Sequence, residues 1–288
     1  MSELLQAVVS GLLVGLTYAI LGVGFSLTWG AIGVINISHS ALAVLGAYLG
    51  YYALHIFNMD PVLSLIIIVP VFFLLGVLLN TTLIKALSKK TRHIGFASMI
   101  LTFGIAIALE NIMIEVFSAD PRVLKTGYIM VSHNIGGVYI SGGYVIASIL
   151  SVLTLFLVYY FLYHTYNGKA VRAFEQEPDG AALSGINTGK VGSLTAGIAF
   201  ATAGIAGVCL AMIYPFEPAI HLHWLIILFL VVILGGVGSV PGTLIAGLIA
   251  GLIVTVGGVW VPYSLVNLLM FVTLILILAI RPKGIIAQ

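Results

Sequence analysis

Residues 168–191 read GKAVRAFEQEPDGAALSGINTGKV and form the longest stretch of this chain without the character of a membrane span. Six of the chain's twenty Asp, Glu, Lys and Arg residues fall within it. These six are Lys169, Arg172, Glu175, Glu177, Asp179 and Lys190. A chain that has few charges and concentrates them in one loop presents a surface outside the bilayer. The apolar remainder of the chain is therefore organised around this loop.

The local pattern of the loop predicts two short helices separated by a break. Residues 170–176 are helix formers, and Pro178 cannot lie inside the helix that they form. Asp179 is a suitable N-cap for a second helix over residues 181–185. We interpret this helix, break, helix unit as a docking surface on a cytoplasmic loop.

The composition of the chain is that of an integral membrane protein. Hydrophobic residues make up 61% and charged residues 7% of its 288 residues, whereas about a quarter of the residues in soluble domains are charged. No stretch is long enough for a second folded domain, so residues 1–288 are predicted to form one transmembrane domain. A GxxxxGK[ST] phosphate loop is absent from the sequence, as is a grouping of nucleophile, base and orienting residue. We therefore expect no enzyme, no cofactor held by this chain and an energy source on another chain.

Apolar windows close to the ~20 residues that cross a bilayer recur along the chain. They lie at about 5–28, 33–57, 62–84, 94–117, 140–163, 191–213, 222–236, 242–260 and 262–280. The windows predict an all-α, polytopic bundle of eight or nine membrane segments. Two of them are interrupted, by a polar cluster after residue 35 and by GGVGSVPG at 235–242. Because a broken membrane helix must satisfy its freed backbone groups inside the protein, both are predicted to be discontinuous helices beside a cavity.

The basic residues predict the orientation of the bundle. Positive residues favour the cytoplasmic side, and they gather in three places: Lys85, Lys89, Lys90 and Arg92 in one loop, Lys169, Arg172 and Lys190 in the charged loop, and Arg281 and Lys283 near the C-terminus. The loops at 58–61, 118–139, 214–221 and about 261 are then expected on the opposite side, although Arg122 and Lys125 count against this for the second loop. Clusters between apolar stretches fit this bias better than nucleic-acid binding, so no nucleic-acid partner is expected.

Small residues recur at the spacing that allows close approach of membrane helices. The pairs are Gly11 and Gly15, Gly46 and Gly50, and Gly247 and Gly251. Packing within this chain is the favoured interpretation, and a seam between two copies is the alternative. The order of span, polar interruption and Gly-rich helix at 5–57 and again at 191–258 suggests an internal repeat, which would place a substrate path between the halves.

A polar cluster inside the second window is the main candidate for the substrate pathway. Asn36, Ser38 and His39 offer neutral donors and acceptors, which suit a route that releases a polar solute. The backbone around Gly235, Gly236 and Gly238 is expected to face them from the second half of the chain. The alternative is that Asn36 or Ser38 only caps a helix.

Two further polar groups carry weaker signals. Glu110, beside Asn111 and one turn before Glu115, lies near the end of its window. We expect its carboxylate to reach the membrane interface or to pair with a residue such as Arg122; the alternative is a role in a proton relay. Glu217, His221 and His223 do not predict a metal site, because two histidines at i and i+2 point to different sides of a helix.

Three motifs in order identify a resemblance that covers nearly the whole chain. They are LLVGLTYAILGVGFSLTWGAIGVINISHSALAVLGAYLG at 12–50, the charged loop at 168–191, and VVILGGVGSVPGTLIAGLIAG at 231–251, followed by RPKGI at 281–285. With these motifs the chain resembles the membrane-spanning permease subunits of bacterial and archaeal ABC importers for branched-chain amino acids. The expected location is therefore the inner (cytoplasmic) membrane.

The resemblance implies that residues 168–191 are a coupling loop, in which AALSGIN at 181–187 is the short helix that seats on a cytoplasmic ATPase. The residues implied in coupling are Arg172, Glu175, Gln176, Asp179, Ala181, Ala182, Gly185 and Ile186. The implied partners are a second homologous permease subunit, two ATPase subunits that carry ATP and Mg, and a periplasmic or lipid-anchored substrate-binding protein.

Two departures from the family pattern lie near the inferred pathway. NISHSA at 36–41 stands where the family usually has an N-[FM]-A-H-G-E type sequence, and HLHWLIILF at 221–229 is bulkier than the usual small-residue run. The substrate therefore stays open between branched-chain amino acids and urea, short amides or aromatic acids. The alternatives of another class are an ion-driven secondary transporter or channel, and a membrane scaffold; the charged loop favours the ATP-driven importer.

Overall fold

The computed structural model describes residues 2–91, 93–281 and 284–286, so the predictions that involve Arg92 and Lys283 lie outside the described residues. The first half of the chain forms α1 (Ser2–Ile32), α2 (Ser38–Phe57), α3 (Pro61–Leu79), the π-helix η1 (Asn80–Ile84), α4 (Lys85–Ser88) and α5 (Ile94–Phe117). A short connection follows, with α6 (Gly127–Met130), β1 (Ser132–Ile135) and β2 (Val138–Ser141). The second half forms α7 (Gly142–His164), α8 (Tyr166–Gln176), α9 (Pro178–Leu183), α10 (Thr188–Ile213), the 3-10 helix η2 (Pro218–Ile220), α11 (His221–Gly235), α12 (Val240–Trp260) and α13 (Tyr263–Ile280).

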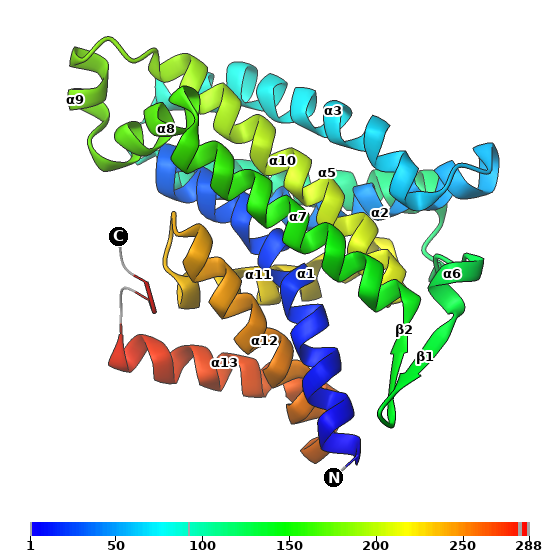
Figure 1. Cartoon of the computed structure of the whole chain (residues 1–288). Helices are drawn as coiled ribbons and strands as arrows, with labels where there is room; N and C mark the ends of the chain where they lie inside the picture. Colours follow the sequence, from blue (N-terminus) through cyan, green and yellow to red (C-terminus); the bar gives the residue numbers. More distant parts are fainter. Residues whose placement is uncertain (1, 92, 282–283, 287–288) are drawn as a thin grey trace.

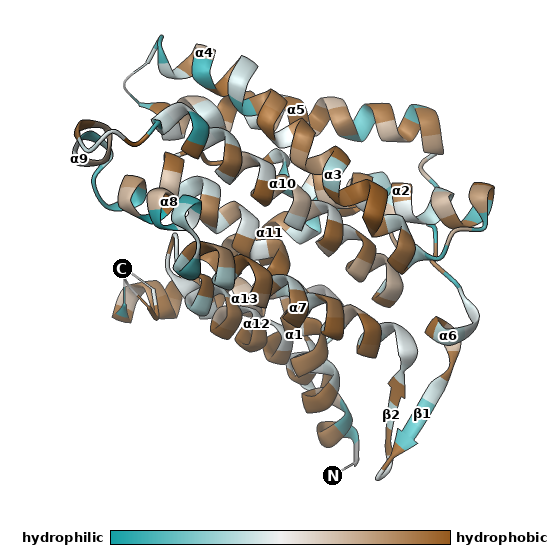
Figure 2. Ribbon diagram, turned by 45° about the horizontal axis from the view of Figure 1, so that its top comes forward, coloured by the Kyte–Doolittle hydropathy of each residue, from teal (hydrophilic) through white to brown (hydrophobic). Residues whose placement is uncertain are grey.

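Among the described residues, eight helical segments are long and apolar enough to cross a membrane. The shorter apolar helix 268–280 lies within α13 and corresponds to the ninth predicted window. The predicted all-α, polytopic bundle is thereby confirmed, and hydrophobic residues dominate its long helices (Figure 2).

The connections gather at two opposite ends of the bundle (Figure 1). At one end, α8 and α9 lie near the start of α10, and the tail returns to the end of α11, where the Ile285 amide donates to the Leu234 carbonyl at 2.8 Å. At the other end, the amide of Arg122 bonds to the Phe216 carbonyl at 2.8 Å, which joins two of the loops predicted to share a side. The start of α1 and residues 284–286 lie at opposite ends of the bundle, an arrangement that fits an odd number of crossings, with α13 as the ninth.

The most buried helix is α10, with 83% of its span window inside the molecule. It packs against α1, α2 and α3, whereas α3 and α5 form the outside of the bundle, with 22% and 17% of their windows buried. The centre is therefore built on α1 and α10, and the faces of α3 and α5 are left for lipid.

Glycine pairs bring α1 and α12 into direct backbone contact. A Cβ atom built on Gly15 would lie 2.7 Å from the carbonyl oxygen of Gly247, and one built on Gly247 would lie 2.6 Å from that of Gly15. Gly11 and Gly251 meet in the same way, and Gly46 of α2 meets Gly204 of α10. Packing within this chain, the favoured interpretation of these pairs, is confirmed.

The first predicted break separates α1 from α2. Gly33 ends α1 with a φ of 65°, a conformation that glycine adopts without strain. The extended segment that follows bonds to α5, because Ser98 Oγ accepts from the Ile35 amide at 3.1 Å and Thr102 Oγ1 accepts from the Ile37 amide at 2.9 Å. These two hydroxyls, four residues apart on one face of α5, were not singled out from the sequence. They satisfy the freed backbone groups as a buried break requires.

The second predicted break separates α11 from α12. Gly236 and Gly238 have φ angles of 94° and 85°, and Ser239 caps α12 by accepting from the Gly242 amide at 3.0 Å. Pro241 lies in the first turn of α12, where its missing N–H costs no helical hydrogen bond. Both predicted breaks are therefore present, but each separates two helices that are long enough to cross a membrane by themselves, instead of interrupting a single span.

The β-hairpin is an addition that was not predicted. Its two-residue turn, Gly136 and Gly137, has positive φ at both positions, as a tight hairpin turn requires. The side chain of Gln6 ties β2 to the start of α1, since its Oε1 accepts from the Tyr139 amide and its Nε2 donates to the Tyr139 carbonyl, both at 2.8 Å.

Candidate functional site

The charged loop folds into two helices, as predicted, at one end of the bundle (Figure 1). Thr165 caps α8, because its Oγ1 accepts from the Gly168 amide at 3.0 Å. The predicted N-cap of the second helix is wrong: α9 begins at Pro178, its N-cap is Glu177, and Asp179 lies within the first turn. The physical reason is that proline, with its fixed φ and no N–H, suits the first helical position, so the helix starts one residue before Asp179.

The inner side of α8 packs on the bundle. Val171 is buried, and the guanidinium carbon of Arg172 lies 4.4 Å from the centre of the Tyr163 ring on α7. Glu175 is half-buried and points towards Gly30 and Gly238. Arg172 and Glu175, two of the predicted coupling residues, therefore contact the membrane helices of this chain.

The outer side of the loop is formed mainly by α9 and the turn that follows it. Ala181 is buried and anchors α9, whereas the remaining predicted residues in the loop are exposed or, for Ile186, half-buried. The exposed ones are Gln176, Asp179, Ala182 and Gly185. Leu183 lies within the AALSGIN stretch but was not named among the coupling residues; it is 90% exposed and is the most prominent apolar side chain of this surface. The outer surface of this loop, defined by Gln176, Asp179, Ala182, Leu183 and Gly185, is named the coupling surface below.

The polar cluster at the start of α2 lies in the interior of the bundle. Asn36 is 2% exposed, and Ser38 and His39 are fully buried. Ser38 Oγ donates to Asn36 Oδ1 at 2.6 Å, and the His39 amide donates to the Asn36 carbonyl at 3.1 Å. The His39 ring lies beside the Leu21 backbone, but neither of its nitrogens forms a hydrogen bond of good geometry among the described residues.

The alternative in which Asn36 or Ser38 caps α2 is wrong. The N-cap position is held by Ile37, which forms no side-chain cap. Asn36 uses its side-chain oxygen to accept from the Ser38 hydroxyl instead of from a backbone amide in the first turn. The first turn of α2 therefore begins deep in the bundle without a side-chain cap, and the cluster stays the candidate for a polar route.

The two predicted parts of the pathway lie on different sides of α1. Gly24 of α1 faces the His39 ring, whereas Ser26 Oγ accepts from the Gly238 amide at 2.8 Å. Two residues along a helix correspond to a rotation of about 200°. Gly235, Gly236 and Gly238 are thus next to the charged loop and the tail, and the structure does not bring them together with Asn36, Ser38 and His39.

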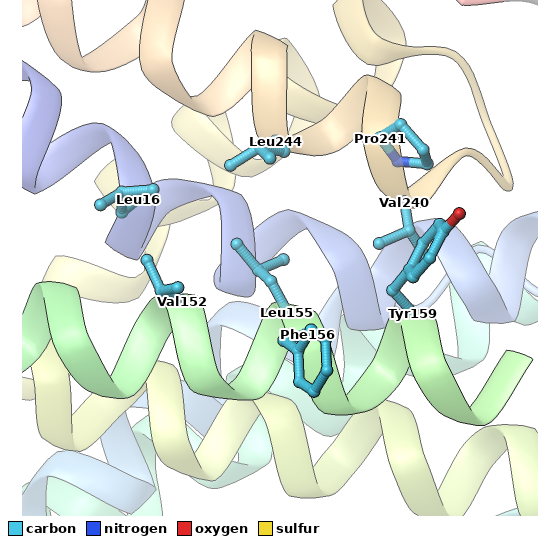
Figure 3. A pocket seen from close by; sticks show the side chains of 8 residues that line it. All are labelled: Leu16, Val152, Leu155, Phe156, Tyr159, Val240, Pro241 and Leu244. Carbon is cyan, nitrogen blue, oxygen red and sulfur yellow. The ribbon is translucent and has the colours of Figure 1, made fainter.

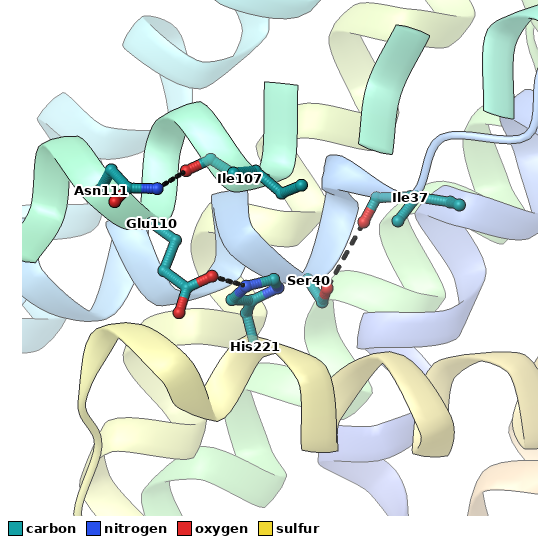
Figure 4. A network of polar contacts seen from close by, with 6 residues as sticks. All are labelled: Ile37, Ser40, Ile107, Glu110, Asn111 and His221. Carbon is teal, nitrogen blue, oxygen red and sulfur yellow. Dashed lines mark hydrogen bonds and ion pairs between the residues drawn. The ribbon is translucent and has the colours of Figure 1, made fainter. Parts of the chain in front are cut away.

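A carboxyl–imidazole pair joins α5 to the start of α11 near the opposite end (Figure 4). His221 Nε2 lies 3.0 Å from Glu110 Oε2, and the His221 side chain is 2% exposed. The predicted partner Arg122 is wrong, since its guanidinium bonds to the Phe117 carbonyl and to Ser118 Oγ. The packing of η2, which leads directly into His221, against α5 supplies a nearer partner than the loop does, and only the tertiary structure shows this.

His223 lies apart from His221, in a small cavity of about 130 Å³ that Tyr18, Tyr214 and Trp224 also line. The two histidines thus have different surroundings, as their spacing predicts. No group of three or more His, Cys, Asp or Glu side chains that could hold a metal is found within the described part of the chain.

The cavity drawn in Figure 3 lies among α1, α7 and α12 and has a volume of about 360 Å³. Its lining is Leu16, Val152, Leu155, Phe156, Tyr159, Val240, Pro241 and Leu244. Apart from the Tyr159 hydroxyl, these side chains offer no hydrogen-bonding group. The cavity therefore suits hydrocarbon better than a polar solute.

Comparisons with known proteins agree with this architecture. A family described as "Branched-chain amino acid transport system / permease component" matches residues 7–279. The chain is 28% identical over 298 residues to the high-affinity branched-chain amino acid transport system permease protein BraD of Pseudomonas aeruginosa, which covers 99% of this chain and 96% of the relative. It is 26% identical over 294 residues to the corresponding protein LivH of Salmonella typhimurium, with 99% and 96% covered. A probable LivH of Methanocaldococcus jannaschii is 27% identical over 240 residues, with 81% and 74% covered.

No solved structure matches the chain. The family match extends over nearly all of the membrane helices described above, including those on either side of both breaks, and over the charged loop. The chain therefore belongs to the family of branched-chain amino acid transport system permease components.

Proposed function

We propose that the chain is the membrane-spanning permease subunit of an ATP-driven importer for branched-chain amino acids. Family membership supports the permease role, and the names of the relatives support the substrate class. The observation that carries the ATP-driven mechanism is the coupling surface, which projects from one end of an otherwise apolar bundle (Figure 2). The chain takes no catalytic part, so ATP and Mg are bound by partner subunits.

The coupling surface has the form expected of a short helix that seats in a groove of another protein. Ala182 and Leu183 face outwards, while the buried Ala181 fixes α9 against the rest of the loop. Gly185 turns the chain towards α10 with a φ of 83°, and Asn187 caps α10 by accepting from the Lys190 amide at 3.0 Å. A small apolar knob on a rigid support is a recurring way in which helices dock into grooves.

The complete importer in this proposal contains a second homologous permease subunit, two cytoplasmic ATPase subunits and a periplasmic or lipid-anchored substrate-binding protein. Its place is the inner (cytoplasmic) membrane, with the coupling surface in the cytoplasm. Lys85, Lys169 and Lys190 support this orientation because they lie at the same end as the coupling surface, whereas Arg122 and Lys125 lie in the connection at the opposite end.

The experiment that tests the coupling surface replaces Leu183 by Asp and measures co-purification of the ATPase subunits with the permease. A buried carboxylate in the groove would be costly to desolvate, so we expect association to fall about tenfold or more. Ile135→Asp, at an aliphatic residue that is 66% exposed in the hairpin at the opposite end, is the matched control and should leave association unchanged. Full association and ATP-dependent uptake in the Leu183→Asp variant would contradict the proposal.

We place the substrate route beside Asn36, Ser38 and His39. Neutral polar groups hold a solute weakly, which favours passage after the binding protein has released it. Asn36→Leu or His39→Leu should lower the uptake rate at saturating binding protein, without changing ATPase association or the affinity of the binding protein for substrate. Unmodified rates of ATP hydrolysis and uptake in reconstituted vesicles, from a variant that elutes as a folded protein, would place the route elsewhere.

An ion-driven transporter is the second candidate, because the Glu110–His221 pair places titratable groups between two spans. The two functions differ in energy source. Uptake into vesicles that contain the permease without ATPases, driven by a pH gradient, would support the second candidate; uptake that needs ATP and both ATPases supports the first. A competition series of leucine, valine, urea, a short amide and an aromatic acid in the same vesicles then identifies the substrate.

A further inference from the structure

Glu175 occupies an inward position at the last turn of α8. Its neighbours Gln176 and Glu177 are exposed, whereas Glu175 is half-buried. Cβ atoms built on Gly30 and on Gly238 would both overlap with Glu175 Oε1. The carboxyl group therefore fits into a notch between the end of α1 and the break between α11 and α12, and the notch exists because both positions are glycine.

The break itself is held from several sides. Ser26 of α1 accepts a hydrogen bond from the Gly238 amide, and the tail residue Gly284 packs against Gly236. A Cβ atom built on Gly30 would lie 2.6 Å from the Gly238 Cα, so α1 and the break are in backbone contact at this point. A displacement of Glu175 would consequently alter the packing of both α1 and the break between α11 and α12.

A carboxyl group is a costly choice for this position. Burial raises the pKa of Glu175 to about 7, while the nearby Arg172 lowers it. A side chain of similar shape without charge, such as glutamine, would fill the notch without that desolvation cost. Groups with strongly perturbed pKa values cluster at functional sites.

We propose that Glu175 is the positioning residue that transmits movement of the coupling surface to the ends of α1 and α11–α12, through insertion of its carboxyl group between Gly30 and Gly238. The proposal rests on the proposed function, since it requires an ATPase that moves α8 and α9. It assigns to Glu175 a role distinct from ATPase contact, which the outer residues Ala182 and Leu183 provide.

The test uses the complete importer in vesicles and measures hydrogen–deuterium exchange with and without nucleotide. In the unmodified complex, nucleotide binding should change exchange at the amides of residues 236–240 and protect residues 178–186. In Glu175→Ala the change at 236–240 should shrink about fivefold or more, the lower end of usual coupling between sites, while protection at 178–186 and ATPase association persist. The amount of substrate taken up per ATP hydrolysed should fall by a similar factor.

Two variants make the result specific. Glu175→Gln keeps the shape that fills the notch, so it should retain most of the nucleotide-dependent change in exchange at residues 236–240. If the role of Glu175 required a fixed charge, this variant would lose that change. Glu115→Ala removes an exposed carboxylate at the opposite end and should behave as the unmodified protein.

Three results overturn the proposal in different ways. A normal response at 236–240 and normal uptake per ATP in Glu175→Ala would show that the insertion transmits nothing. Loss of ATPase association in Glu175→Ala would make Glu175 a docking residue instead. Failure of the unmodified permease to bind ATPases would overturn the proposed function. This failure would be seen in the unmodified complex, before any variant is compared with it.

Discussion

The carboxyl group of Glu175 lowers the stability of the folded protein by an amount that depends on pH. Burial raises its pKa from the ordinary 4.5 to about 7 in the folded protein. Between these values the folded state binds a proton that the unfolded state has lost, so stability falls as pH rises through this range. Below the ordinary pKa the side chain is neutral in both states and the cost is absent.

Glu175→Gln should therefore raise the thermal unfolding midpoint at pH 8 and change it little at pH 5. The gain is at most about 3 kcal/mol, because one pKa unit corresponds to about 1.4 kcal/mol, and partial exposure of the group reduces it. Thermal unfolding in detergent at both pH values measures the difference. Glu115→Gln serves as the control. If Glu175→Gln changed the unfolding midpoint by the same amount at pH 5 and at pH 8, the expected titration of Glu175 would be contradicted.

The Glu110–His221 pair shows a limit of reasoning at the residue scale. The position of Glu110 near the end of its window correctly indicates that it needs a partner. The choice between Arg122 and His221 depends on where α11 packs, 111 residues further along the chain. Spacing in the sequence favours the near residue, and the fold supplies the distant one.

At the scale of elements, the seam between α1 and α12 depends on the absence of side chains. The backbones of Gly15 and Gly247 are close enough that a single methyl group on either would overlap with the other helix. Without a hydrophobic driving force between membrane helices, such close packing is a main source of their association. The seam matters for function because α1 and α12 also meet near the Glu175 notch.

Replacing Gly247 and Gly251 together by Leu should separate α1 from α12 and destabilise the bundle by about 3 kcal/mol or more, since overpacking of a tight interface cannot relax locally. Detergent-solubilised yield, elution profile and thermal midpoint measure the effect. Gly104→Leu is the control, because nothing lies within 4 Å of a Cβ atom built on this exposed glycine of α5. An unchanged midpoint in the double variant would mean that the seam is not required for folding.

The sequence predicts only part of the structure of the two breaks, which follow α1 and α11. Glycine, proline and polar residues in the sequence predict where α1 ends and where α11 ends, because these residue types act locally on the backbone. They do not predict which groups satisfy the freed backbone. Ser98 and Thr102 perform this role for the first break from a helix that lies about 60 residues further along the chain.

At the scale of the whole molecule, the two ends of the bundle predict the accessibility of single cysteines. Cys209 is fully buried, so the natural chain should react little with a membrane-impermeant maleimide. Lys89→Cys and Ala182→Cys should be labelled from the cytoplasmic side, and Asn134→Cys in the hairpin from the opposite side, because these residues are exposed at opposite ends. The measurement is labelling of intact cells against inverted vesicles. Labelling of Ala182→Cys and Asn134→Cys from the same side would contradict a membrane crossing by α7, the span that separates them.

The sequence by itself determined the membrane class, the windows of the spans, the two breaks, the helix pair of the charged loop and the family. These follow from hydropathy, helix punctuation and motifs, all of which are properties of short segments. The tertiary structure alone decided that Glu175 points inwards to Gly30 and Gly238, that Glu110 pairs with His221, and that α1 stands between the polar cluster and the glycines of the second break. The physical reason is that these membrane helices are apolar nearly all round, so their sequences carry little information about which face meets which neighbour. Close packing of backbones and a few buried polar contacts between distant segments settle the rotation of each helix, and they exist only in the folded bundle.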